Sequence, residues 1–126
     1  MRVRIALLSL AAGLMLAANV AAAPTATPPK LFGKVGINDA FVITLKDAKG
    51  KKVKTLKAGS YKFVVKDGSD LHNFFLEKQK GGTYHKKITT IPGKGTKTVV
   101  IKLSKGKYKY YCQAHESSMF GFVTVT

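Results

Sequence analysis

The sequence predicts an all-β fold, a sandwich or barrel of about seven to eight short strands. Three observations predict it. From Leu31 onward, apolar residues alternate with polar ones, which is the period of half-buried strands. Turn-forming Gly, Pro, Asp and Ser recur about every eight to twelve residues, a spacing typical of antiparallel sandwiches and barrels. No segment carries a clear helical period.

The strands can be followed in order along the chain. We expect them around Val35, Ile43, Val53, Phe63, Phe75, Ile88, Val100, Tyr110 and Val123, with the weakest of these being loops. In the clear runs one face is apolar: Phe41, Ile43 and Leu45; Tyr61, Phe63 and Val65; Val99, Ile101 and Leu103; Tyr108, Tyr110 and Cys112. Six aromatic positions are expected in the core rather than on a base-stacking surface: Phe74, Phe75, Tyr110, Tyr111, Phe120 and Phe122.

The N-terminus has the features of a secretory signal peptide over residues 1–23. A basic start is followed by an apolar run of about 16 residues and by small alanines before Pro24. An uncleaved membrane anchor is the alternative, although a spanning helix needs roughly 20 apolar residues. Residues 24–30, rich in Pro and Thr, are expected to form a short stiff linker, and residues 31–126 one domain. The protein is therefore expected to be periplasmic, on the cell surface or secreted.

Cys112 is the only cysteine of the chain. An exported protein with a single cysteine makes no internal disulfide, so this thiol is inert packing, half of an intermolecular bridge, or a reactive or metal-bound thiolate. His115 and Met119 follow it closely and favour the metal-bound thiolate.

The basic charge of the expected mature chain comes from lysine alone. Both arginines precede residue 24, which leaves twenty lysines against six acidic residues and a net charge of +14. Such an excess is typical of proteins that bind nucleic acid, an anionic membrane or an acidic protein. The export signal, the lack of arginine forks and the spread of lysines along the chain argue against nucleic acid. An acidic redox partner, the anionic cell envelope, or a soluble lysine-covered sheet surface remain as alternatives.

Four residues in two segments carry the donor atoms of a metal site. Cys112, His115 and Met119 lie between the last two expected strands, and His72 follows the turn at Asp67–Asp70. Thiolate, two imidazoles and a thioether are the ligands of trigonal blue-copper sites, in which the thioether is a weak axial ligand. The set contains no carboxylate, which argues against magnesium or calcium. The sequence therefore predicts one copper ion, cycling between Cu(I) and Cu(II), that ties two distant segments together.

These two segments resemble the cupredoxin family of blue type 1 copper proteins, of the plastocyanin, amicyanin and pseudoazurin type. The resemblance rests on His72-Asn73-Phe74 and on the run from Tyr111 to Gly121, and it extends in strand pattern over residues 31–126. It implies a Greek-key β-sandwich with a mononuclear copper at one end. The residues that it makes functional are the metal ligands His72, Cys112, His115 and Met119, with Asn73 bracing the cysteine loop by hydrogen bonds. It also implies a buried His72 and a His115 that reaches the surface.

The chain departs from this family pattern at two places. Three residues separate His115 from Met119, where the named members have two or four, so we expect an axial bond unlike theirs in length. Glu116 places a carboxylate where the family usually has an apolar docking patch. His85, outside both segments, is expected to be an ordinary exposed histidine.

The resemblance and the ligand set favour a monomeric one-electron carrier that meets redox partner proteins. An envelope copper carrier or sequestering protein using the same ligands is the main alternative. An enzyme is not expected, because the sequence offers one copper site, no nucleophile and base pair, and few acids. A metal-free adhesion module, in which Cys112 and His115 only pack, is the remaining alternative.

Overall fold

The computed structural model describes residues 17–22 and 26–126. Most of the predicted signal peptide, residues 1–16 and 23, and the first two linker positions, 24–25, lie outside the described residues. Within the described ranges, no helix is long and apolar enough to cross a membrane.

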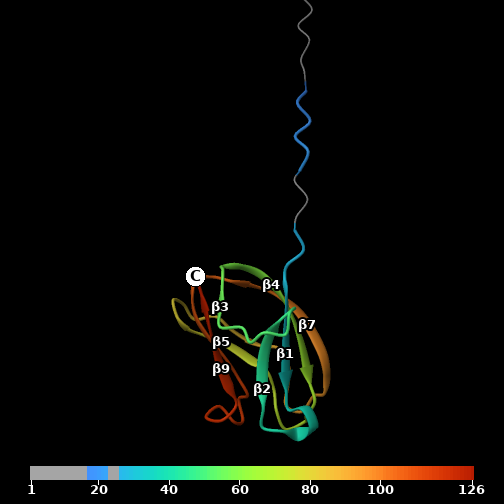
Figure 1. Cartoon of the computed structure of the whole chain (residues 1–126), viewed down its shortest axis with the longest axis vertical. Coiled ribbons are helices and arrows are strands. Elements are labelled where there is room, and N and C mark those ends of the chain that lie inside the picture. Colours follow the sequence, from blue (N-terminus) through green and yellow to red (C-terminus); the bar gives the residue numbers. More distant parts are fainter. Residues whose placement is uncertain (1–16, 23–25) are drawn as a thin grey trace, which may run out of the picture.

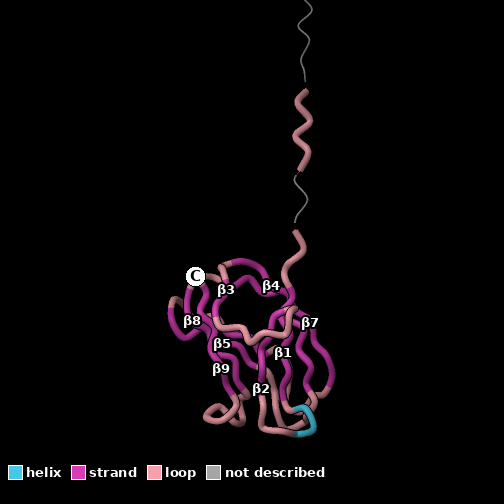
Figure 2. Tube along the Cα trace, viewed as in Figure 1, coloured by secondary structure: helices cyan, strands magenta, loops and turns pink. Residues whose placement is uncertain are grey.

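Two mixed sheets pack face to face (Figures 1 and 2). The first sheet has the strand order β2 (Ile43–Asp47), β1 (Lys30–Val35), β4 (Gly59–Asp67), β7 (Gly95–Leu103). The second has the order β3 (Thr55–Leu56), β9 (Phe120–Val125), β8 (Gly106–Tyr111), β5 (Phe75–Lys80), β6 (His85–Lys87). Strands β1 and β4 pair in parallel, as do β3 and β9, and the other pairs are antiparallel.

This architecture confirms the predicted all-β sandwich. The described part of the chain has nine strands instead of seven or eight, because β3 and β6 are short strands of two and three residues. The one helical element described is a 3-10 turn, η1 (Ile37–Asp39).

The core follows from the two-residue period of the strands. Phe63 and Val65 of β4 are fully buried between the sheets, and Tyr108 and Tyr110 of β8 face them from the second sheet at 1% exposure. Phe74 stacks on Tyr110 with ring centroids 5.6 Å apart. Burial of these apolar faces is the main favourable contribution to folding, since the chain has no disulfide.

Two of the six predicted core aromatics are wrong. Phe120 and Phe122 are 45% and 39% exposed, because the alternation of β9 turns Val123 inward and therefore these two rings outward. Lysine ammonium groups lie over both rings, with Lys107 Nζ 4.3 Å from the Phe122 centroid and Lys109 Nζ 5.1 Å from that of Phe120. At exposed sites such cation–π contacts are favourable, so both rings have partners on the outer surface of the sheet.

Four loops gather at one end of the sandwich (lower end in Figure 1). Strands β1, β4, β6 and β8 end there, and β2, β5, β7 and β9 begin there. We call residues 36–42, 68–73, 89–94 and 112–119 the metal-end loops, because they hold every predicted ligand. The chain enters β1 at the opposite end.

Candidate metal centre

A hydrogen-bonded reversal of the chain after β4 directs the His72 side chain into the protein interior. After β4, the Ser69 N–H donates to Asp67 Oδ1 at 3.0 Å, and the Leu71 N–H donates to Ser69 Oγ at 3.0 Å. Two successive side-chain to backbone bonds of this kind fix a tight reversal. They leave Leu71 59% exposed and His72 fully buried.

The far nitrogen of His72 has its own partner. His72 Nε2 lies 3.3 Å from the carbonyl oxygen of Asp39, in η1. A carbonyl only accepts, so Nε2 is the donor in this contact, and Nδ1 is the nitrogen that faces His115 and Cys112. A metal-ligating histidine is commonly held this way through its other nitrogen.

Cys112, His115 and Met119 lie on one compact loop. The Cys112 N–H donates to the Met119 carbonyl at 3.0 Å, and the Met119 N–H donates to the His115 carbonyl at 2.9 Å. The His115 N–H donates to the Cys112 carbonyl at 3.1 Å. These backbone bonds fold the loop back so that its ends continue the pairing of β8 with β9.

Three donor atoms from the two segments converge. The Nδ1 atoms of His72 and His115 lie 3.0 Å apart, and the Sγ of Cys112 lies 3.7 Å from each of them. Ligand atoms about 2.0–2.3 Å from one ion lie roughly 3–4 Å from each other. The arrangement therefore fits a single metal ion bound by two nitrogens and one sulfur, a donor set that suits copper.

The other two predicted residues lie next to these donors in the fold, Met119 through its backbone bonds with Cys112 and His115 and Asn73 through its side chain. Met119 is 1% exposed and is the one methionine in the described ranges. Asn73 bridges the two segments, because its Nδ2 donates to Gln113 Oε1 and its Oδ1 accepts from the Gln113 N–H, both at 2.9 Å. Its side chain thereby holds the residue next to Cys112 in place. His85 is exposed on β6, stacks on Phe75 at 6.0 Å and does not belong to the cluster.

Phe41 was missed as a site residue. We expected it inside a strand, but β2 begins only at Ile43 and Phe41 lies in the loop before it, 59% exposed. Its ring makes edge contacts with His72 and His115, at centroid distances of 4.9 and 4.6 Å. Phe41 therefore covers both imidazoles on their solvent side.

The loop before Phe41 was also missed. Gly36, Asn38 and Asp39 all have positive φ, of 60°, 57° and 58°. Asn and Asp adopt this conformation more readily than other non-glycine residues, so the run Gly-Ile-Asn-Asp was the available signal for a turn. A β-carbon on Gly36 would lie 2.7 Å from His72 Cδ2, so the backbone there forms one wall against the imidazole.

Asp67 places a buried carboxyl behind the His72 turn. It is 2% exposed, and its Oδ2 has no hydrogen-bond partner among the described residues. Burial raises the pKa of Asp67 above its ordinary value, and the opposing effects of Thr89, the Ser69 N–H and His72 are smaller.

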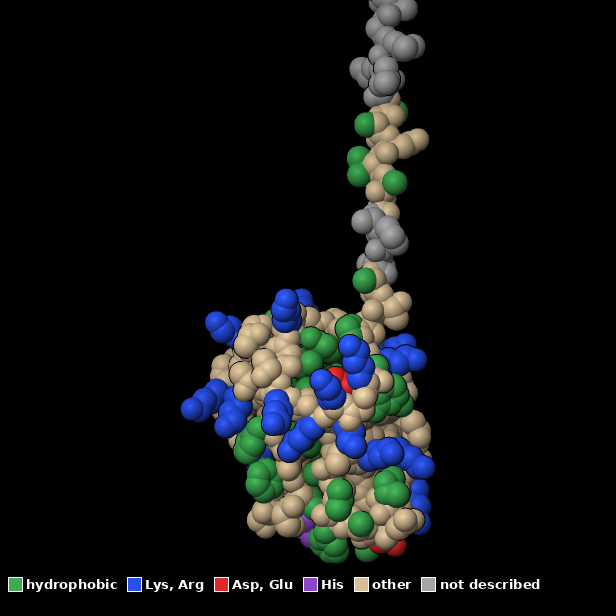
Figure 3. All heavy atoms as spheres, in the orientation of Figure 1, with side chains coloured by type: hydrophobic (Ala, Val, Ile, Leu, Met, Phe, Trp, Pro, Cys, Tyr) green, Lys and Arg blue, Asp and Glu red, His purple; other side chains and the backbone are tan. Residues whose placement is uncertain are grey.

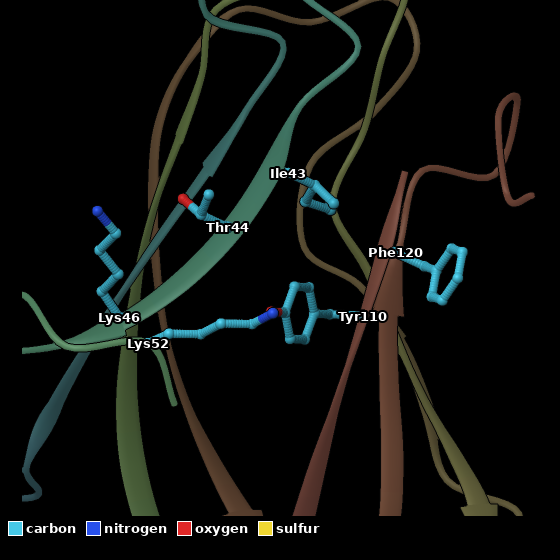
Figure 4. A pocket seen from close by; sticks show the side chains of 6 residues that line it. All are labelled: Ile43, Thr44, Lys46, Lys52, Tyr110 and Phe120. Atoms are coloured by element: carbon cyan, nitrogen blue, oxygen red, sulfur yellow. The ribbon is translucent and has the colours of Figure 1, made fainter. Parts of the chain in front are cut away.

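A separate pocket of about 120 Å³ opens between the edge of β2 and strands β8 and β9 (Figure 4). In Figure 4 the stem of Lys52 reaches toward Tyr110, while Ile43 and Phe120 flank it. The lining residues contribute no imidazole, thiol or carboxylate, so this pocket is not a second metal site.

Comparison with known structures supports the fold. Auracyanin A, a "blue" copper protein from the green thermophilic photosynthetic bacterium Chloroflexus aurantiacus, matches with a TM-score of 0.55 and 18% identity, over 79% of this chain and 100% of that chain. Rusticyanin from Thiobacillus ferrooxidans matches with a TM-score of 0.52 and 16% identity, over 77% of this chain and 76% of that one. A structure of reduced rusticyanin matches with a TM-score of 0.53 and 14% identity, over 82% of both chains. A search of curated proteins gave no match.

A two-sheet sandwich with a His, Cys and His cluster at one end defines a cupredoxin, a protein whose site takes one copper ion. The family described as copper binding proteins, plastocyanin/azurin family, matches residues 41–126. The chain belongs to that family, which confirms the family resemblance seen in the sequence.

Proposed function

We propose that the protein is an exported one-electron carrier in which His72, Cys112, His115 and Met119 would hold a copper ion. The single observation that carries this proposal is the convergence of two Nδ1 atoms and one Sγ within 3.0–3.7 Å of each other. Copper, when bound, supplies the Cu(I)/Cu(II) couple.

The surroundings of the donors support retention of the ion over exchange. His72 and Cys112 are fully buried and Met119 is 1% exposed. The Asp39 carbonyl accepts a hydrogen bond from His72 Nε2, and the Asn73 side chain fixes the cysteine loop through Gln113. A donor set fixed by hydrogen bonds moves little when the charge of the site changes, which favours fast electron exchange.

His115 is the proposed point of electron exchange. It is the one partly exposed member of the donor cluster, and the edge of Phe41 shields it on one side. A partner that contacts this end of the molecule reaches the imidazole directly.

The test is a redox titration of the copper-loaded protein with a matched variant. The wild type is expected to bind one copper, to show an intense visible thiolate-to-copper band, and to lose and regain that band reversibly with one electron. Cys112→Ser removes the thiolate while leaving a side chain of similar size, so it should lack the band. A colourless wild type contradicts the copper assignment.

Incubation of the copper-loaded protein with a Cu(I) chelator distinguishes an electron carrier from a protein that carries copper. A retained ion should leave over hours or longer, because three ligands are buried. Loss within the mixing time favours the copper carrier.

Export is tested by the position of the N-terminal residue in protein recovered from outside the cytoplasm, where cleavage near residue 23 is expected.

A further inference from the structure

The lysines avoid the metal end of the molecule. The metal-end loops contain one lysine and three acids: Lys94, Asp39, Asp70 and Glu116. The remaining nineteen lysines lie on the strands and on the opposite end. Figure 3 shows lysine side chains spread over the body of the sandwich, while the end with the visible histidine is mostly apolar or uncharged. The lysines are spread evenly along the sequence, but in the folded molecule they are concentrated away from the metal end.

One sheet face carries five of these nineteen lysines and no acid. Outward positions of β1, β2 and β4 in the first sheet carry five lysines: Lys30, Lys34, Lys46, Lys62 and Lys66. The acids of these strands, Asp47 and Asp67, pair in register with the inward residues Leu31 and Val35, so neither shares this face. We call the five lysines the lysine platform.

Lysines stand side by side on this platform. Lys30 pairs with Lys62, and Lys34 with Lys66, in the parallel register of β1 and β4. Like charges opposite each other destabilise a sheet. Only Lys94 and Lys109 lie within 4.0 Å of a carboxylate among the described residues, so none of the five platform lysines forms an ion pair. An anionic partner would offset it.

Exposed apolar residues lie among these charges. Phe32 is 37% exposed and pairs with Val64, while Val100 on β7 is 52% exposed and pairs with Lys62. A sheet face with a few apolar side chains among lysines has the composition of surfaces that bind the interface of an anionic bilayer. The described residues contain no arginine, the side chain best suited to phosphate or base recognition in nucleic acid.

We propose that the lysine platform binds the surface of an anionic lipid membrane. The platform is a broad face on the side of the sandwich and the donors lie at one end, so a bound molecule leaves the His115 edge in water. Because lipid headgroups move laterally to meet each lysine, binding to a membrane does not need the geometric match that a folded partner requires. The proposal does not depend on bound copper.

The experiment is co-sedimentation with phosphatidylglycerol vesicles, with phosphatidylcholine vesicles as the control for apolar binding. Wild-type protein is expected to bind the anionic vesicles and to lose binding as salt rises toward 1 M, where the screening length falls to about 3 Å. The paired variant Lys34→Gln with Lys66→Gln should bind roughly 30-fold more weakly, since each lysine near an anionic surface contributes about a factor of five.

The matched control is Lys86→Gln with Lys87→Gln, which removes the same charge from exposed positions of β6 in the second sheet. It should retain most of the binding. Equal losses in the two paired variants would overturn the platform, since net charge alone would then explain binding. Absence of wild-type binding to anionic vesicles, or capture by polyglutamate in their place, would overturn the membrane as partner. Cys112→Ser should bind vesicles like the wild type, so this test stays separate from that of electron transfer.

Discussion

Gly36 offers the sharpest test of how the backbone positions His72. It has φ of 60°, and a β-carbon there would approach His72 Cδ2 and Ser69 Cβ at 2.7 Å each. His72 is fully buried and held by Asp39, so its ring cannot turn away freely. Gly36→Ala is therefore expected to strain the backbone and also to displace the imidazole.

The matched control is Gly50→Ala. Gly50 also has positive φ, 79°, but nothing lies within 4 Å of a β-carbon there. Positive φ costs a non-glycine residue roughly 1–2 kcal/mol, so both variants should lose that much stability. Gly36→Ala should lose about 1–3 kcal/mol more, the usual cost of overpacking. Each kcal/mol lowers Tm by about 4–8 °C in a domain of this size.

Thermal unfolding of the metal-free proteins measures this difference, and the visible spectrum of the copper-loaded proteins measures the displacement of His72. Gly50→Ala should keep the wild-type spectrum, while Gly36→Ala should change it. Equal losses of Tm together with identical spectra would refute the role of Gly36 as a wall against the imidazole.

Three further outcomes are expected. Asn73→Ala removes two hydrogen bonds and leaves the Gln113 N–H without its acceptor, so the free energy of unfolding in urea should fall by about 2–4 kcal/mol; an unchanged value contradicts the bracing role. Phe41→Ala should speed copper loss to a chelator while costing under about 1 kcal/mol of stability, because the ring is largely exposed but covers both imidazoles; unchanged loss of copper would count against the cover. Burial raises the pKa of Asp67, so the native state of the metal-free protein binds the Asp67 proton more tightly than the unfolded state does. The native state therefore loses stability as pH rises from the ordinary pKa of the carboxyl through the raised one. Asp67→Asn should lack this part of the loss in urea titrations carried upward from about pH 4, and matching curves for the two proteins would contradict it.

The sequence predicted the sandwich and the donor set because both depend on local patterns. Alternation in Tyr61–Val65 and Val99–Leu103 is a property of each strand alone, and the structure has both segments in strands with their apolar sides inward. The spacing of Cys112 and His115 confines two donors to one short loop. Family-specific matches at His72 then supplied the third donor.

The same reasoning failed where long-range contacts decide. Phe120 has the composition of a core residue, but which face of β9 turns inward depends on pairing with β8, where Gly121 lies against Tyr110. Phe41 alternates with Ile43 in the sequence, yet β2 begins only at Ile43, and Phe41 lies in the loop that the positive-φ residues Asn38 and Asp39 form before it. The uneven distribution of lysines over the surface could not be predicted for a similar reason. Lysines that are evenly spaced along the chain become unevenly placed once the four lysine-poor metal-end loops meet at one end.

The central claim is that the three converging donors bind one copper ion, and diffraction at the copper absorption edge from crystals of the loaded protein tests it most directly. One anomalous peak is predicted, within bonding distance of Nδ1 of His72, Nδ1 of His115 and Sγ of Cys112. A peak at His85 or elsewhere, with none among these three atoms, would contradict the account.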